Sequence, residues 1–359
     1  DYLSAASFLG IAGMIAIYGY DGFLYSIGYL AGWMVALFVV AEPLKRLGKY
    51  TFADAIDAKF SSRGVIFAAA VSTLIVSLFY LIPQMVGAGT LITPLLGLPF
   101  EAGVIMVGAV VILIVATAGM ASTTYVQFIK GGLLVIFSLV IVGMLLVRGF
   151  ATNPEHEGTT FHMLSTIPLT SSQTGDIVPA DSSYTVVEEF NIGANTFVKV
   201  SKDGLETYWK LEAAQNVLTE AQSIVTPPSG PALYNGAPKE DGRFFQVGNF
   251  AEIEGNTDPS YKSGAVNPFS FFSVIKDSTV IRWGTQKFTD GDSAVTLYFQ
   301  KPTDGSQVLV PGEKFKIDPA KGATTADRVN FISLLISLFL GTAALPHILI
   351  RYYTVPTPA

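Results

Sequence analysis

The sequence contains no cysteine, and long stretches of it contain no charged residue. Without cysteine the chain has neither a disulfide framework nor thiolate chemistry. Only 14% of its 359 residues are charged and 50% are hydrophobic, which is too apolar for an ordinary water-soluble domain. The sequence also lacks a GxSxG motif, a P-loop and a Cys/His zinc spacing. We therefore expect a protein that is not an enzyme.

The charge-free stretches have the length of membrane spans. They cover residues 2–20, 22–41, 64–100, 102–129, 131–147 and 329–350. A bilayer core of about 30 Å needs about 20 apolar residues in a helix, and a charge at the helix centre would cost about 2.5–3.5 kcal/mol. Buried helices of soluble proteins rarely run so long without a charged face. We predict an α-helical integral membrane protein with about six transmembrane helices in a lipid bilayer.

A different composition marks an insert between the fifth and sixth spans. Residues 151–328 hold 22 acidic and 14 basic residues, whereas the remainder holds 6 acidic and 8 basic ones. This acidic balance argues against nucleic-acid binding. We expect transmembrane helices over 1–150, a mostly β insert over 151–325 and one further transmembrane helix over 326–359. Because both ends of the sequence lie directly beside apolar runs, we also expect a piece of a longer chain.

Within the insert, β-branched and aromatic residues predict strands. We expect strands over 184–200, a hairpin of 278–288 and 294–300 around Asp290-Gly291, a strand pair over 307–317 with a turn at Pro311-Gly312, and one helix over 203–225. Residues 226–265 are rich in Pro, Gly, Asn and Ser and are expected to form a loop.

Basic residues in short loops predict the orientation in the membrane. Five of them follow the second span, namely Lys45, Arg46, Lys49, Lys59 and Arg63, and we place that loop in the cytoplasm. The insert then lies outside, and the sixth span ends at Arg351 in the cytoplasm. Arg148 is the exception, because it falls on the outer side.

Small and polar residues interrupt the first and sixth spans. Ser4 and Ser7 precede Gly10 in the first span, and the run Gly341–Ala344 precedes Pro346 in the sixth. Irregular backbone at membrane depth survives only where it is buried in protein or lines a cavity, and unwound carbonyls are good ligands for sodium. The alternative is close helix packing through small residues. We predict that Ser7 and Thr342 lie near each other across the two interruptions.

Other polar residues leave more than one interpretation open. Gln84, which follows Pro83 in the third span, serves either helix packing or a cavity wall. His347 could carry a proton, but a packing or helix-end role near the cytoplasmic interface is favoured. His156 and His162 lack the i, i+4 spacing of a metal pair on one helix, so a solvated loop is favoured.

Several runs resemble bacterial cation/acetate symporters of the sodium:solute symporter family. They are SAASFLGIAG, YDGFLYSIGYLAGW, RLGKYTFADA, YLIPQMVGAGTLI and RVNFISLLISLFLGTAALPHILIRYYTVPTP. The resemblance covers about residues 1–150 and 326–359, and the insert resembles the enlarged loop of a subgroup only in its position.

The resemblance implies a partial LeuT-like inverted-repeat core with alternating access. It implies that Leu3 and Ser4 hold Na+ through backbone or hydroxyl oxygens, as part of a site that this sequence does not complete. Substrate would meet Ser7, Gln84 and a sixth-helix group, namely Gly341, Thr342 and Ala343. Gln127 stands where several sodium-coupled relatives carry an aspartate, which leaves the number and identity of the coupling ions open.

The function that we expect is Na+-coupled symport of a small monocarboxylate, such as acetate, across the bacterial inner membrane, with the insert in the periplasm. Three alternatives remain. They are a symporter for another solute such as proline or a sugar, a sensory receptor built on the transporter fold, and a main role for the insert as a binding or assembly module. A small membrane subunit or a periplasmic partner of the insert is left open.

Overall fold

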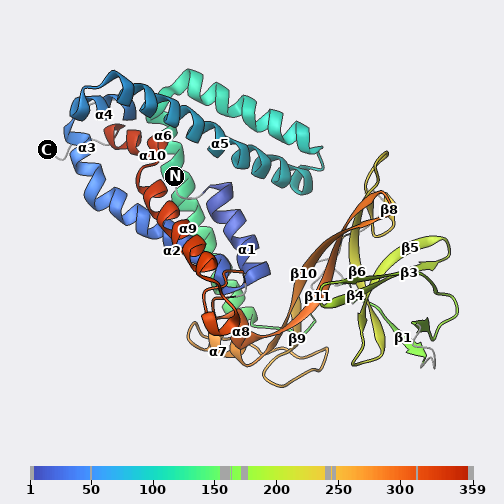
Figure 1. The fold of residues 1–359 in the computed structure, drawn as a ribbon. Coiled ribbons are helices and arrows are strands. Elements are labelled where there is room, and N and C mark those ends of the chain that lie inside the picture. The colour runs from blue at the N-terminus through green and yellow to red at the C-terminus, as the bar shows by residue number, and fades with distance from the viewer. Residues whose placement is uncertain are drawn as a thin grey trace. The chain divides into compact units, whose positions relative to one another are not determined.

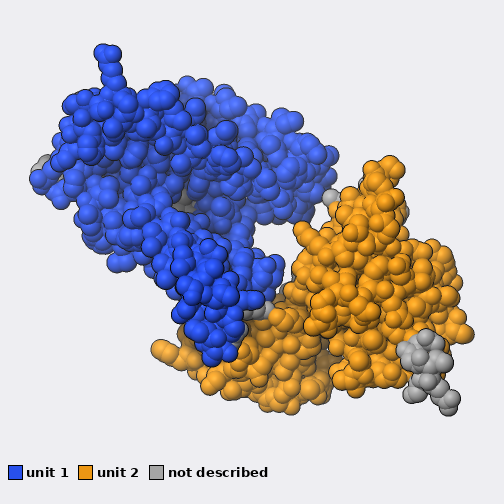
Figure 2. Space-filling model, viewed as in Figure 1, with its two compact units in different colours: residues 1–145, 310–359 blue, residues 146–309 orange. Residues whose placement is uncertain are grey.

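A computed structural model describes residues 4–48, 51–153, 162, 164–170, 177–238, 244, 248–312 and 314–354. The chain divides into two compact units, a helical unit of residues 1–145 and 310–359 and a sheet unit of residues 146–309 (Figure 2). The sheet unit ends before the boundary expected at 325, because the segment that follows it hydrogen-bonds to Asp21 of the helical unit.

The helical unit is an assembly of apolar helices (Figure 1). Its described elements are η1 (Ala5–Gly10), α1 (Ile11–Tyr18), α2 (Tyr20–Val35), η2 (Ala36–Val40), α3 (Ala41–Arg46), α4 (Phe52–Phe60), α5 (Arg63–Leu96), α6 (Phe100–Arg148), η3 (Pro319–Lys321), α9 (Thr325–Ala343), α10 (Pro346–Leu349) and η4 (Ile350–Thr354). Helices α2 and α9 run side by side (Figure 1). They approach closely at Gly32, where a Cβ atom would lie only 2.6 Å from the carbonyl oxygen of Phe339.

Five helices in the described part of the chain are long and apolar enough to cross a membrane. They are Tyr20–Arg46, Arg63–Leu96, Phe100–Gly119, Ser122–Arg148 and Thr325–Tyr353. The first of the six expected spans is instead a shorter apolar helix, Ala5–Tyr18. It ends before Gly19, whose φ of 59° lets the chain bend sharply into α2.

The boundary between the fourth and fifth spans differs from the sequence prediction. The charge-free stretch continues to residue 129, and we expected Thr123, Thr124 and Gln127 to begin the fifth span; the backbone bends before them, at Gly119, with φ 64° and ψ −164°. Glycine reaches this conformation without the Cβ clash that other residues would suffer. Lys130 therefore lies inside the helix Ser122–Arg148 instead of at its start.

The sheet unit is built from antiparallel strands. They are β1 (Thr166–Thr170), β2 (Val178–Pro179), β3 (Thr185–Ile192), β4 (Asn195–Lys202), β5 (Leu205–Glu212), β6 (Val217–Thr226), β7 (Leu233–Tyr234), β8 (Ala237–Pro238), β9 (Asn249–Glu252), β10 (Thr279–Asp290) and β11 (Ser293–Asp304), with the short helices α7 (Ser270–Lys276) and α8 (Gly305–Val308). The main path of paired strands is β3-β4-β5-β6-β11-β10-β9, and β1 and β7 also pair with β6.

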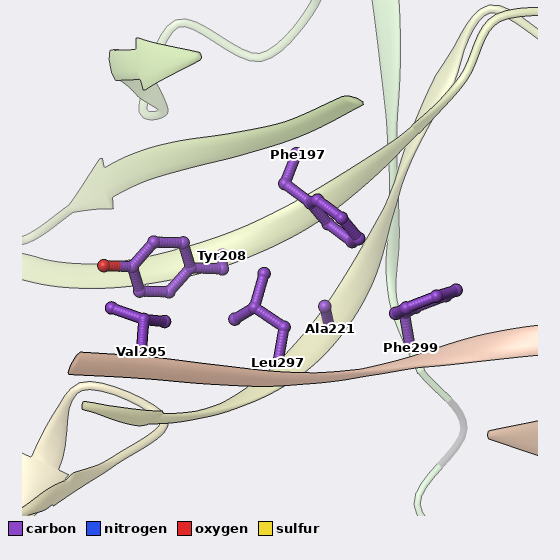
Figure 3. Packing of buried hydrophobic residues seen from close by; sticks show 6 residues of the cluster. All are labelled: Phe197, Tyr208, Ala221, Val295, Leu297 and Phe299. Atoms are coloured by element: carbon purple, nitrogen blue, oxygen red, sulfur yellow. The ribbon is translucent and has the colours of Figure 1, made fainter. Parts of the chain in front are cut away.

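Two hydrophobic clusters lie on opposite faces of strands β4 and β5. Phe197 and Tyr208 belong to one cluster, whereas their chain neighbours Val198 and Trp209 belong to the other. Successive side chains of a strand point to opposite faces, so both faces of these strands are covered. The first cluster also takes Val295, Leu297 and Phe299 from β11 (Figure 3).

A polar cluster joins strands β4, β5 and β10 beside this core. Lys199 Nζ lies 2.8 Å from a Glu206 carboxylate oxygen and 2.9 Å from Asp290 Oδ2, and the Tyr208 hydroxyl donates to the same Asp290 oxygen. Burial by itself raises the pKa of Asp290, but the hydrogen bonds from Tyr208 and Lys199 and the charge of Lys199 bring that pKa below its ordinary value. Burial, and then the Asp290 carboxylate, raise the pKa of Tyr208.

Three expectations for the insert are wrong, and the first of them is the loop over 226–265, which contains the short strands β7, β8 and β9. Residues 203–225 form strands β5 and β6 and not a helix, with a turn that places Asn216 at φ 54°. Because these strands are buried on both faces, apolar and polar residues do not alternate along them. The apolar residues then match the spacing of a helix by accident. Residues 307–317 form no strand pair within the described part of the segment, since helix α8 and irregular backbone occupy it. The expected hairpin at Asp290-Gly291 is confirmed.

Candidate functional site

The first interrupted helix begins at a serine pair. Ser4 is extended, with φ −106° and ψ 168°, and only 8% of it is exposed. Its hydroxyl accepts a hydrogen bond from the Ser7 backbone N–H at 3.1 Å, and the Ser7 hydroxyl accepts one from the Ser4 backbone N–H at 3.2 Å. The two hydroxyl oxygens are 2.9 Å apart. This reciprocal cap satisfies donors at a helix start that would otherwise be stranded inside the protein.

Gln84 of α5 holds the same helix start from the side. Its Oε1 accepts a hydrogen bond from the Ala5 backbone N–H at 3.1 Å. Gly87, one turn further along α5, permits this approach, because a Cβ there would lie 2.5 Å from the Cβ of Ala5. The Gln84 Nε2 is buried and has no hydrogen-bond partner among the described residues. A buried donor of this kind is costly unless a ligand or another group accepts from it.

The second interruption separates α9 from α10. Helix α9 ends at Ala343, Leu345 is extended with φ −62° and ψ 111°, and Pro346 opens α10. Proline explains the break, since it has no N–H to donate and disfavours a helical residue before it. Thr342 is 3% exposed, so its hydroxyl lies inside the protein.

The two interruptions share a small cavity of about 40 Å³. Its wall consists of Ser4, Ala6, Ser7, Tyr29, Trp33, Tyr80, Thr342, Leu345 and Ile348. The space is close to that of one water molecule in the liquid, about 30 Å³. Its wall includes three residues with aliphatic hydroxyls, Ser4, Ser7 and Thr342, from two distant parts of the sequence, and the tyrosines Tyr29 and Tyr80.

A larger cavity of about 440 Å³ shares four wall residues with the small one, namely Tyr29, Tyr80, Thr342 and Leu345. Its wall is completed by Phe52, Ser72, Thr73, Val76, Ser337, Leu338, Gly341, Ala344 and Pro346. No side chain of this wall carries a charge, and hydroxyls supply its polar groups. The volume lies within the range of small-molecule sites, about 300–1,000 Å³.

The residues predicted for the site are distributed unevenly over these two cavities. Ser4 and Ser7 line the small cavity, Gly341 lines the larger one, and Thr342 lines both. Gln84 and Ala343 belong to neither wall. Leu3 lies outside the described residues.

Sequence reasoning missed the aromatic part of the site. Tyr29 and Trp33 line the small cavity together from one face of α2, and Tyr80 lines it from α5. Tyr29 and Trp33 are four residues apart on a helix with glycine-rich flanks, and this spacing could have indicated that they share one face of the helix. His347 packs on Tyr80 with ring centroids 4.5 Å apart, in line with the packing role expected for it.

The described residues contain no group of three or more His, Cys, Asp or Glu side chains that could hold a metal ion. His162 lies beside Glu220, with Nε2 3.4 Å from each carboxylate oxygen, and His156 lies outside the described residues. Hydroxyl and carbonyl oxygens, such as those of the serine pair, are ligands that a hard cation prefers.

Spanning-length apolar helices, with two interrupted ones around a common cavity, define a membrane protein of the secondary-transporter class. Residues 1–171 match the model of the sodium:solute symporter family. The chain belongs to this family.

The curated relatives agree with this assignment. The chain is 51% identical to the uncharacterized symporter YwcA of Bacillus subtilis, over 94% of this chain and 66% of the relative. It is 34% identical to a monocarboxylic acid transporter of Corynebacterium glutamicum, over 99% of this chain and 41% of the relative. The chain thus spans about two thirds and two fifths of the length of these two proteins. No solved structure matches it.

Proposed function

We propose that the full-length protein carries a small monocarboxylate, such as acetate, together with Na+ across the bacterial inner membrane. The observation that carries this proposal is the pair of cavities at the two helix interruptions, with Thr342 in both walls. The name of the 34% identical relative, a monocarboxylic acid transporter, supports the choice of substrate class.

The cation fits the small cavity in size and ligand type. The hydroxyls of Ser4, Ser7 and Thr342 line a space for about one water-sized species, and hard cations bind oxygen ligands. We assign Leu3 to the same site through its backbone carbonyl, as the family resemblance implies.

The larger cavity has a mostly apolar wall with a few hydroxyls, which suits a short hydrocarbon chain. A wall without charged side chains suits a small solute that carries only one charge of its own. The buried Gln84 Nε2 next to Ala5 is a donor, and its chemical complement is an anion and not a cation. We therefore propose Gln84 as a donor to the carboxylate group, although it lines neither cavity in this structure. Gly341, in the wall of the larger cavity, and the nearby Ala343 are small residues that suit a short chain.

We further propose that the helical unit is part of a LeuT-like inverted-repeat core that works by alternating access. Coupling then consists of a higher substrate affinity in the sodium-bound state, and by linkage a higher sodium affinity in the substrate-bound state. Coupling energies of this kind change the affinity by about 5–150-fold.

The orientation proposal places the sheet unit in the periplasm, since the loop with Lys45 and Arg46 is assigned to the cytoplasm. Ser182 and Ser61 are both exposed and suit a labelling test. In intact spheroplasts, an impermeant thiol reagent should label a Ser182→Cys protein but label a Ser61→Cys protein only after lysis. The reverse result would invert the topology.

Uptake of labelled acetate by the full-length protein in proteoliposomes tests the function. An inward sodium gradient should drive accumulation, and a choline gradient of equal size should not. Short monocarboxylates should compete with acetate, whereas proline and glucose should not. Uptake that ignores the sodium gradient, or competition by proline or glucose alone, would reject the proposal and favour another solute. Absence of any uptake would favour the receptor alternative.

A further inference from the structure

Asp21 is an ionisable residue that the proposed site does not use, yet it is fully buried, with 0% of it exposed. It stands at the beginning of α2 and accepts three backbone hydrogen bonds from a segment almost three hundred residues later. Its Oδ1 accepts from the N–H of Gly312 at 2.9 Å. Its Oδ2 accepts from those of Lys314 at 2.6 Å and Phe315 at 3.1 Å.

The side chains around Asp21 join the same segment to three helices. Lys314 Nζ lies 4.5 Å from the ring centre of Tyr18, the last residue of α1. The ring of Phe315 lies 5.7 Å from that of Tyr25 on α2 and 5.3 Å from that of Phe331 on α9. Gly312, Lys314 and Phe315 therefore tie the end of α1, the start of α2 and the first turns of α9 to one another.

The bend between α1 and α2 makes this contact possible. At Gly19 the backbone has φ 59°, and at Gly22 a Cβ atom would lie 2.4 Å from the backbone nitrogen of Ile15. Both positions need glycine, the first for its conformation and the second for space. The tight bend brings Asp21 next to the segment before α9.

The hydrogen bonds of Asp21 determine which groups its carboxylate can bind and how costly it is to break the contact. Both oxygens of Asp21 face backbone N–H groups, whose positive ends repel a cation, so Asp21 is not a ligand for the coupling ion. A buried carboxylate that loses such bonds is left charged and unpaired in a medium of low polarity. The contact is therefore expected to stay closed while the rest of the helical unit moves.

We propose that Asp21 is a positioning residue for transport, which locks the adjoining ends of α1, α2 and α9 into one rigid body. This proposal rests on the proposed transport function. The helices of this body carry residues of both cavity walls, including Tyr29 on α2 and Thr342 on α9. A rigid connection at one end makes the two interrupted helices change position together, so that the two walls remain in register.

The first test is the variant Asp21→Asn in the full-length protein, measured as sodium-driven acetate uptake. It should lower the maximal rate by about tenfold or more, the equivalent of losing one charge-assisted hydrogen bond, while the KM for acetate stays nearly constant. The matched control is Asp318→Asn, which alters an exposed aspartate on the same segment that accepts a hydrogen bond from the Ala320 N–H. The control should transport normally. A normal maximal rate in Asp21→Asn would overturn the proposal.

A cross-link separates a rigid connection from a gate that opens in every cycle. The chain has no cysteine, so Tyr25→Cys and Phe315→Cys can be joined by a short bifunctional thiol reagent. In the protein with Asp21 intact, the cross-link should leave transport unchanged. In the Asp21→Asn background it should restore the rate, which neither single cysteine does. Loss of transport on cross-linking the intact protein, or failure to restore the rate, would contradict the proposal.

A third measurement does not depend on transport and so distinguishes this proposal from the function itself. A single Phe315→Cys should react slowly with an impermeant thiol reagent when Asp21 is present and several times faster in the Asp21→Asn background. Equal rates would show that Asp21 does not hold the segment, whatever the protein transports. If uptake fails for every variant while this difference is found, only the proposed function is rejected.

Discussion

Phe197 of the sheet unit is 0% exposed, whereas Phe128 of the helical unit is 80% exposed, although both side chains are identical. The contrast extends to their surroundings. The sheet unit buries large aromatic side chains such as Trp209, whereas the residues that the helical unit buries are aliphatic, small or polar, such as Ile348, Ala36 and Asp21. The two units thus distribute the same kinds of residue in opposite ways.

This difference in burial is the one expected when one unit folds in water and the other in a lipid bilayer. In water, burial of apolar area is the main favourable term, so a sheet turns its aromatic residues inward. In a bilayer the lipid is as apolar as leucine, and helices associate instead through small residues and polar contacts. This contrast agrees with the proposal that the polar interior of the helical unit binds the solute, and the sheet unit is expected to behave as an ordinary water-soluble fold.

The largest expected effect comes from filling the polar interior of the helical unit. Ser7→Trp or Thr342→Trp should abolish sodium-driven uptake in the full-length protein, because an indole at Ser7 cannot fit the cavity of about 40 Å³ and one at Thr342 would occupy the larger cavity proposed for the substrate. Val140→Trp, at a position that is 51% exposed on a membrane-spanning helix, should be tolerated. Membrane insertion of all three variants is checked by the yield of monodisperse protein in detergent. Normal transport by both site variants would exclude this site.

The next largest effect concerns the stability of the sheet unit in water. We expect residues 146–309 to fold alone in water, and Phe197→Ala to lower the free energy of unfolding of this segment by about 3–5 kcal/mol, as for other buried aromatic residues. Urea denaturation measures the loss. Phe128→Ala in the helical unit should change stability by only about 0.5 kcal/mol, measured by thermal denaturation in detergent. Similar costs at the two positions would contradict the comparison.

The smallest effect is electrostatic and is confined to the sheet unit. Because the folded-state pKa of Asp290 is lowered, its contribution to stability is present above its unfolded pKa of about 3.9 and is lost as the pH falls through the folded value. The variant Asp290→Asn should cost about 1–3 kcal/mol at pH 7 and flatten the loss of stability below about pH 4. Urea denaturation at several pH values measures both. An unchanged pH profile would exclude this role of Asp290.

Much of the helical unit could be predicted from local sequence. Charge-free runs located the spanning helices, and Pro346 located the break in the sixth, since bilayer insertion and proline chemistry act within a few residues. The hydroxyls of Ser4, Ser7 and Thr342 were found by the same reasoning. The bend at Gly119 was missed, because one glycine inside an apolar run does not reveal whether it adopts a positive φ.

The remaining features depend on contacts between distant parts of the chain. Nothing near Asp21 indicates that its partners are the N–H groups of Gly312 and Lys314, so the segment was predicted as a hairpin instead. Strands β5 and β6 pack on both faces, so their sequences lack the alternation of apolar and polar residues that marks a strand. For that reason they were predicted as a helix. Local periodicity cannot show which elements will pack on a strand.

The central claim, a joint sodium and monocarboxylate site at the two helix interruptions, is tested most directly by ligand protection of a cysteine at the site. Thr342→Cys is placed in an otherwise cysteine-free full-length protein, and its reaction with a small thiol reagent is followed in membranes. Sodium and acetate together should slow the reaction far more than either alone, because each raises the affinity for the other. A reaction rate that is the same with and without both ligands would contradict the account.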